Sequence, residues 1–282
     1  MGGGRRLHRR LTGPSVVGFC ALSVVAGCDT MRQDIGEISL KSTTPSEAAR
    51  MMMDTTDPDS RRMGTVLISN SAFGGTDIYV QWYRDSVESE PDPLVRAVSV
   101  SALGRHGTPQ DAVVIALRLD DEQFQVRWEA AKALQRLHNP AVVPVVLATL
   151  RDEDEEPDIR VAAGIGLGQY PQDRVFQALV AALDTPQLSI NEAARGSLRT
   201  LTGEDHGLEP APWLRWYNGA ANPFAGQKEY LYPTYQREES FLEKLAFWSS
   251  RSYEEPAVPT GLEQGGRRTY SDSDEAATDE GG

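Results

Sequence analysis

The chain has 282 residues, 40% of them hydrophobic, which is enough for one large domain or two ordinary ones with a packed core. This composition excludes a fully disordered or a collagen-like protein. The formal net charge is −13, from 28 Lys and Arg against 41 Asp and Glu, and the one dense basic run lies in the first ten residues. The chain therefore lacks the cationic surface that a nucleic-acid-binding protein needs.

The first 27 residues have the layout of a secretory signal peptide. Four arginines near the start are followed by an apolar stretch from Val16 to Ala26. At about eleven residues this stretch is too short to cross the roughly 30 Å apolar core of a bilayer, so residues 1–27 are left out of the predicted fold. The paired arginines leave open whether export follows the general or the twin-arginine route.

The end of this segment, Val25-Ala26-Gly27-Cys28, resembles the bacterial lipoprotein box. The resemblance implies that Cys28 is acylated, with palmitate among its lipids, and anchors the protein in a bacterial cell envelope on the periplasmic side. Asp29 resembles the inner-membrane retention signal of enterobacterial lipoproteins, which favours the inner over the outer membrane. The alternative is an ordinary signal peptide with an accidental cysteine. Residues 28–43 are predicted to be a tether.

Residues 44–90 are interpreted as a degenerate N-terminal capping repeat. Thr44-Pro45-Ser46-Glu47 has the spacing of a capping box and predicts the start of a helix. Leu67-Ile68 follows Asp57-Pro58 at offsets like those of the clearer repeats downstream, and Tyr79, Trp82 and Tyr83 suggest a second helix.

Residues 91–202 repeat one pattern every 31 to 33 residues. Each repeat opens with an apolar and then a polar residue: Val95-Arg96, Val126-Arg127, Ile159-Arg160 and Ile190-Asn191. Small residues stand four and seven positions after the apolar one, and a leucine stands eight positions after it: Leu103, Leu134, Leu167 and Leu198. These offsets share one face of an α-helix, so each repeat is predicted to begin with a helix that packs closely and ends in a leucine anchor.

A second apolar helix is predicted in each of the first three repeats. The first helix runs into a break that contains Gly, Asn or Pro, and the second helix ends at a leucine: Leu119, Leu150 and Leu183. One helix pair cannot cover its own apolar face, so neighbouring pairs must stack. The predicted fold is an all-α solenoid of stacked helix hairpins.

The repeats resemble the HEAT family, and particularly its short bacterial type, the PBS-lyase HEAT-like repeats. The segments that carry the resemblance are Pro93–Gly104, Val126–Leu134 and Ile159–Gly168. It implies a right-handed α-solenoid whose second helices line the inner curve. It also implies that the arginine after the apolar residue pairs with an acidic group of a neighbouring repeat, which applies to Arg96, Arg127 and Arg160. Asn191 departs from this pattern, as suits a last repeat.

The region after the repeats is predicted to be a non-repeat C-terminal arm. Residues 203–252 contain a short helix with Trp213 and Trp216 one turn apart, interpreted as an aromatic cap over the end of the solenoid. The functional alternative is a ligand-stacking pair. Residues 253–282 are rich in Gly, Ser, Thr, Asp and Glu and are predicted to form a disordered acidic tail.

Three features of the sequence resemble parts of known chemical sites. Gly164–Gly168 is similar to a phosphate-binding loop but falls inside a predicted helix, which favours close packing. The acidic run Asp152–Asp158 lacks the spacing of a calcium loop, which favours a solvated loop. His106, His138 and His206 have no second ligand three or four residues away. No catalytic residue, metal site or cofactor is therefore predicted.

The sequence leads to the hypothesis of a membrane-tethered, non-enzymatic scaffold or adaptor that binds another protein in the bacterial cell envelope. Its acidic balance favours a basic segment of the partner. One alternative is an enzyme or enzyme subunit related to bilin lyases, because some PBS-lyase-type proteins attach bilins. A second alternative is a purely structural envelope component.

Overall fold

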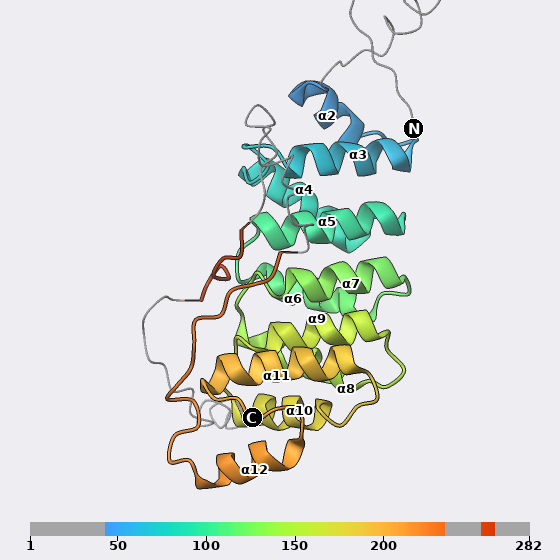
Figure 1. Cartoon of the computed structure of the whole chain (residues 1–282). Coiled ribbons are helices and arrows are strands. Elements are labelled where there is room, and N and C mark those ends of the chain that lie inside the picture. The colour runs from blue at the N-terminus through green and yellow to red at the C-terminus, as the bar shows by residue number, and fades with distance from the viewer. Residues whose placement is uncertain (1–42, 235–254, 263–282) are drawn as a thin grey trace, which may run out of the picture. The chain divides into compact units, whose positions relative to one another are not determined.

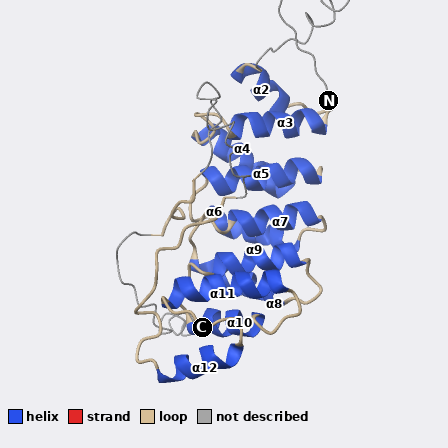
Figure 2. Ribbon diagram, in the orientation of Figure 1, coloured by secondary structure: helices blue, strands red, loops and turns tan. Residues whose placement is uncertain are grey.

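The computed structural model describes residues 43–234 and 255–262. The predicted signal peptide, Cys28 and Asp29 lie outside the described residues, and so does all of the predicted tether except Thr43. Within the described ranges every regular element is a helix, and no β-strand occurs (Figure 2). The helices are α2 (Pro45–Met52), α3 (Pro58–Ser69), α4 (Asp77–Ser89), α5 (Pro93–His106), α6 (Asp111–Ala116), α7 (Phe124–Ala133), α8 (Val143–Arg151), α9 (Pro157–Leu167), α10 (Asp173–Ala182), α11 (Leu188–Thr202) and α12 (Pro210–Gly219), with short 3₁₀ helices η1 (Leu117–Asp120) and η2 (Pro140–Val142).

The helices stack in two rows (Figure 1). The first row consists of α3, α5, α7, α9 and α11, and each of these helices contacts the next. The second row consists of α4, α6, α8 and α10, and each of them contacts the first-row helix that follows it in the chain. The prediction of an all-α solenoid of helix hairpins is confirmed.

Local sequence signals explain where the helices begin. The Thr44 side chain accepts a hydrogen bond from the Glu47 backbone N–H, and the Glu47 carboxylate accepts one from the Thr44 N–H, so the predicted capping box is present. Asp92 caps α5 by accepting from the N–H groups of Leu94 and Val95. Proline occupies the first turn of α2, α3, α5, α9 and α12, where its missing N–H has no cost.

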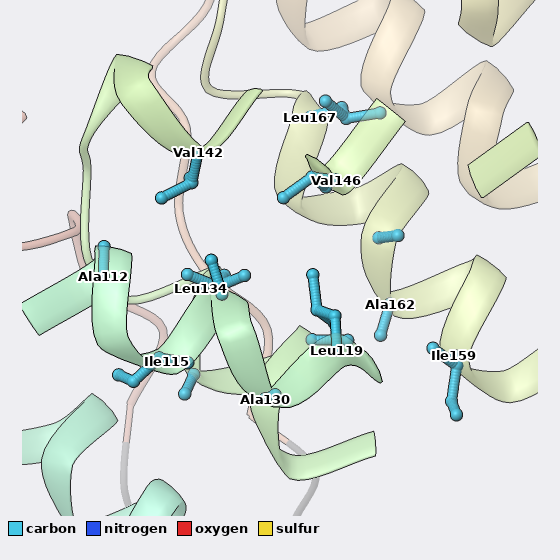
Figure 3. Packing of buried hydrophobic residues seen from close by; sticks show 14 of the residues in the cluster. Ala112, Ile115, Leu119, Ala130, Leu134, Val142, Val146, Ile159, Ala162 and Leu167 are labelled. Atoms are coloured by element: carbon cyan, nitrogen blue, oxygen red, sulfur yellow. The ribbon is translucent and has the colours of Figure 1, made fainter. Parts of the chain in front are cut away.

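The four leucines at the eighth position of the repeat lie in one continuous core. Leu103, Leu134, Leu167 and Leu198 are all at most 3% exposed and belong to a single apolar cluster. Figure 3 shows Leu134 and Leu167 in this cluster with side chains from both rows of helices. Each leucine therefore lies at a junction between helices, as the repeat pattern predicts.

Small residues allow the first-row helices to approach closely. A Cβ added to Gly104 would lie 2.5 Å from the Cβ of Ala133, so α5 and α7 leave no room for a side chain there. Gly164 and Gly166 lie within α9, as predicted, and not in a loop after a strand. A Cβ at either position would meet only ordinary contacts, so close packing does not by itself require these two glycines.

The chain turns back after α12, which packs on α10. The Lys228 N–H donates to the Thr200 carbonyl at 2.8 Å, beside the end of α11, and the Tyr232 N–H donates to the Ala257 carbonyl at 3.0 Å. Residues 220–234 and 255–262 thus run along the side of the stack where the helix hairpins turn (Figure 1).

Residues 255–262 differ from the prediction of a disordered tail from residue 253 onward. This segment pairs with the chain next to α7 through main-chain hydrogen bonds, and Pro259 is buried. The prediction rested on a composition poor in large apolar residues. Main-chain hydrogen bonds and a proline hold the segment without such residues. The rest of the predicted tail lies outside the described residues.

Candidate interaction surface

One edge of the stack carries a row of arginine–carboxylate pairs, which joins the loops that lead into successive first-row helices. Arg96 donates to both carboxylate oxygens of Asp121, each at 2.9 Å, and its Nη1 donates to the Glu90 carbonyl. Arg127 donates to Glu155 at 2.9 and 3.1 Å, and its Nη1 donates to the Asp121 carbonyl. Each arginine therefore links its own loop to the next one.

The degenerate first repeat has the same pair. Arg61 donates to both carboxylate oxygens of Glu90 and, through Nη1, to the Asp54 carbonyl. Sequence reasoning missed this pair because the spacing from Arg61 to Arg96 is 35 residues and the flanking pattern is weak. The signal available was an arginine shortly after a helix-capping Asp-Pro, as at Arg96.

The row stops at the third predicted arginine. Arg160 is buried, but its Nε donates to the Leu150 carbonyl at 3.1 Å, and no carboxylate pairs with it among the described residues. The loop before α11 has Thr185 two residues ahead of the helix N-cap, where the loops before α5 and α7 have Glu90 and Asp121. Asn191 instead donates to the carbonyls of Ala182, Leu183 and Thr185.

The pair with Arg96 lowers the pKa of the Asp121 carboxylate. Burial acts to raise the pKa of Asp121, but hydrogen bonds from Arg96 and from the Gln123 backbone, together with the charge of Arg96, outweigh it and lower the pKa overall. Two parallel bonds per pair fix the geometry of the loops more than they stabilise the fold, because desolvation offsets most of the attraction. We assign these arginines a structural role.

The acidic run Asp152–Asp158 lies on the same edge. Glu155 faces Arg127, and the other acids in the run are exposed. Asp152 accepts from the Asp154 backbone N–H, which forms an ordinary loop turn. Across residues 43–234 and 255–262, no three His, Cys, Asp or Glu side chains form a group that could hold a metal ion.

The second-row helices present an uncharged exposed strip. The residues two and six positions before the buried Leu119, Leu150 and Leu183 are all exposed and uncharged, and Val145 adjoins them. This uncharged strip consists of Val113, Leu117, Pro144, Val145, Ala148, Gln177 and Ala181. On α4 the equivalent positions are Gln81 and Asp85, so the strip begins at α6.

Two members of the strip are large apolar side chains facing solvent. Leu117 is 63% exposed and Val113 is 47% exposed, four residues apart and therefore on one face. Exposed acids follow the strip at the ends of its helices: Asp120, Asp152 and Asp184. Sequence reasoning missed the strip because an apolar residue in an amphipathic repeat usually faces the core. The signal available was the position of Leu117 two residues before the buried Leu119, which places it on another face of the helix.

The aromatic residues of α12 cover the last helix pair. Trp213 is fully buried, its ring 6.5 Å from that of Phe176 in α10, and its Nε1 donates to the Gly207 carbonyl at 2.8 Å. Tyr217 stacks on Phe176 with ring centres 4.2 Å apart, while Trp216 is half-buried. Because Trp213 has no exposed ring face, this geometry favours a cap over a ligand-stacking pair.

The three histidines have separate environments. The His106 Nε2 lies 2.7 Å from the Ser69 carbonyl oxygen, and His206 packs against Trp213 and Trp216. His138 is buried, stacks on Tyr170 and donates from Nδ1 to Gln169 Oε1 at 3.3 Å. These contacts hold the hairpin turns of neighbouring repeats together.

The burial of His138 predicts that stability depends on pH. Burial lowers the pKa of His138 below 6.5, and the hydrogen bond to Gln169 opposes this only in part. The folded chain binds a proton at His138 less readily than the unfolded chain, so the free energy of unfolding falls as the pH drops below about 6.5 toward the folded-state pKa. We expect His138→Gln to weaken this dependence in urea unfolding between about pH 7 and about pH 5. Equal slopes in the two proteins would contradict the assignment.

Comparison with known proteins identifies the repeats. A family model described as HEAT repeats matches residues 80–153 and 112–199, so this part of the chain is similar to HEAT repeats. The bilin biosynthesis protein PecE of Nostoc sp. is 26% identical over 164 residues, which cover 56% of this chain and 63% of that protein. Human deoxyhypusine hydroxylase is 28% identical over 111 residues, which cover 38% of this chain and 37% of that enzyme.

Two solved structures align with more than half of the chain. Human deoxyhypusine hydroxylase in complex with glycerol aligns with a TM-score of 0.41 at 22% identity, covering 55% of this chain and 62% of that one. The complex of CpcE and CpcF of phycocyanin lyase from Nostoc sp. aligns with a TM-score of 0.39 at 17% identity, covering 66% of this chain and 82% of that one.

The expectation that the protein is not an enzyme is wrong as an inference from the sequence, because relatives that match part of this chain are named as a hydroxylase and as a bilin biosynthesis protein. That expectation rested on regular positions being used for stacking. A fold does not determine function, so the use of these positions for stacking does not bear on activity.

Proposed function

We propose that this protein is a HEAT-repeat scaffold that binds a protein partner through the uncharged strip of its second-row helices. The observation that carries the proposal is the exposure of Val113 and Leu117. The corresponding positions on α8 and α10 are also exposed and carry small or uncharged residues. Charged residues are depleted at the centre of protein interfaces, as they are in this strip.

The charged residues around the strip indicate which kind of partner segment would bind it. Asp120, Asp152 and Asp184 are exposed at the ends of the strip helices. A partner segment with an apolar centre and basic residues at one end complements this surface, because opposite charges at the rim favour encounter and fix orientation.

The test is capture of partners from native envelopes with the full chain, its Leu117→Arg variant and a matched control. Leu188→Arg is that control, because Leu188 is also 63% exposed but lies on α11, away from the strip. Proteins recovered with the parent and with Leu188→Arg, but lost with Leu117→Arg, would support the proposal. The same recovery with all three chains would show that the strip does not bind the partner and would overturn the proposal.

We also propose that the scaffold is held at a membrane by lipid on Cys28, on the periplasmic side of the bacterial envelope. The support is the lipoprotein-box pattern Val25–Cys28 followed by Asp29. No helix among the described residues has the length and apolar character needed to cross a membrane.

An enzymatic role is the second candidate, favoured by the relatives that are named for bilin biosynthesis and for hydroxylation. The chain spans 63% of the first of these and 37% of the second, so neither activity follows from the match alone. Stoichiometric uptake of a free bilin by the purified chain, seen as a shift in its visible absorption, would support an enzyme related to bilin metabolism. An unshifted spectrum would count against it.

A further inference from the structure

The segment 255–262 occupies a site on the edge where the helix hairpins turn. The His138 N–H donates to the Thr260 carbonyl at 2.9 Å, and the Thr260 N–H donates to the Arg136 carbonyl at 2.8 Å. Leu137 and Thr260 form a parallel bridge. The segment therefore pairs as an added strand does, through main-chain groups that any extended chain can supply.

The site selects for glycine at one position. Gly261 has φ +91°, and a Cβ there would lie 2.4 Å from Pro109 Cγ and 3.1 Å from the His138 carbonyl oxygen. A side chain is excluded by both the conformation and the space. Pro259, two residues before Gly261, is buried. The site therefore binds a proline, then a residue whose N–H and carbonyl both form main-chain hydrogen bonds, and then a glycine.

Few contacts hold residues 255–262 against the helices. Of its eight residues only Pro259 is buried, and none belongs to the apolar core cluster. The Tyr232 N–H also donates to the Ala257 carbonyl at 3.0 Å. Few hydrogen bonds and one buried side chain must offset the ordering of eight residues, so the segment depends on being in the same chain.

We propose that residues 255–262 are an exchangeable intramolecular ligand, and that the site beneath them docks an extended segment of a protein partner with the pattern proline, any residue, glycine. The bound residues 255–262 support this pattern, because they show which backbone geometry and which side chains the site accepts. The site is on the hairpin-turn edge and the uncharged strip is on the second-row helices, so this inference goes beyond the proposed function and does not depend on it.

The test uses the full chain and a synthetic peptide of residues 255–262. Gly261→Val in the chain should release the segment, since valine cannot adopt the φ of Gly261 or fit beside Pro109. We expect hydrogen exchange at the His138 amide to become at least about tenfold faster in this variant than in the parent. The added peptide should restore the protection, whereas a peptide carrying the same Gly261→Val change should not.

Further variants and a binding measurement distinguish this proposal from alternatives. The parent chain should bind the peptide at least about tenfold more weakly than the Gly261→Val chain, because its own segment competes at high effective concentration. Thr260→Pro, which removes the N–H that bonds to Arg136, should repeat the result of Gly261→Val. Leu117→Arg placed in the Gly261→Val chain should leave peptide binding unchanged, which separates this site from the strip. Unchanged exchange at His138 in both segment variants, or a peptide that fails to restore protection, would overturn the proposal.

Discussion

Leu134→Asp is expected to lower the free energy of unfolding by at least about 3 kcal/mol. Leu134 is 3% exposed and lies in the core cluster with residues of the neighbouring repeats. The substitution removes apolar contacts and places a carboxylate in the apolar core cluster, so the cavity and the desolvation of the charge both act against folding. Urea unfolding followed by circular dichroism measures the loss.

The matched control for this substitution is Leu117→Asp. Leu117 has the same side chain but faces solvent, so its replacement is expected to change stability by no more than about 1 kcal/mol. A midpoint for Leu134→Asp equal to that of the parent would mean that the eighth position of the repeat is not a buried seam. Because repeats stabilise one another only through neighbouring interfaces, the damage should extend to both sides of α7.

Cys28→Ala is expected to abolish lipid attachment and move the protein from the membrane fraction to the soluble fraction. Each buried methylene of an acyl chain contributes about 0.8 kcal/mol, so loss of the lipid is expected to weaken membrane binding strongly. No helix among the described residues is long and apolar enough to cross a membrane in its place. Metabolic labelling with palmitate, followed by fractionation, measures both effects.

Cys20→Ala is the control for lipid attachment. Cys20 is the other cysteine of the chain and lies inside the apolar stretch that precedes the lipoprotein box. The label and the membrane association should survive this change. Labelled acyl chain on the Cys28→Ala protein would show that the lipoprotein-box resemblance is misleading and that another residue carries the lipid.

The first-row helices could be predicted because the side chains that pack between them recur at fixed positions in the sequence. Leu103, Leu134, Leu167 and Leu198 recur at one offset, and only a helical face accounts for that offset together with small residues at the fourth and seventh positions. The pairing of Arg96 and Arg127 with acids of the next repeat, which the family resemblance implied, is present in the structure.

The failures have different physical causes. The loop before α11 offers Thr185 where the earlier loops offer an acid, so Arg160 turns to a carbonyl instead. The docking of residues 255–262 leaves almost no trace in side-chain pattern, because main-chain groups and the absence of a Cβ at Gly261 make it possible. The exposure of Leu117 was hidden because leucine in an amphipathic repeat usually faces inward.

The pairing of Thr260 with Arg136 sets an order of assembly. Each repeat meets its neighbour about 32 residues away and can close as soon as that neighbour has been synthesised, whereas the segment beyond α12 must wait until some 120 further residues have followed Arg136. Residues 255–262 therefore cannot cover the hairpin-turn edge beside His138 until they have been synthesised. Any chain that meets the nascent protein finds this edge before the protein's own C-terminal segment does.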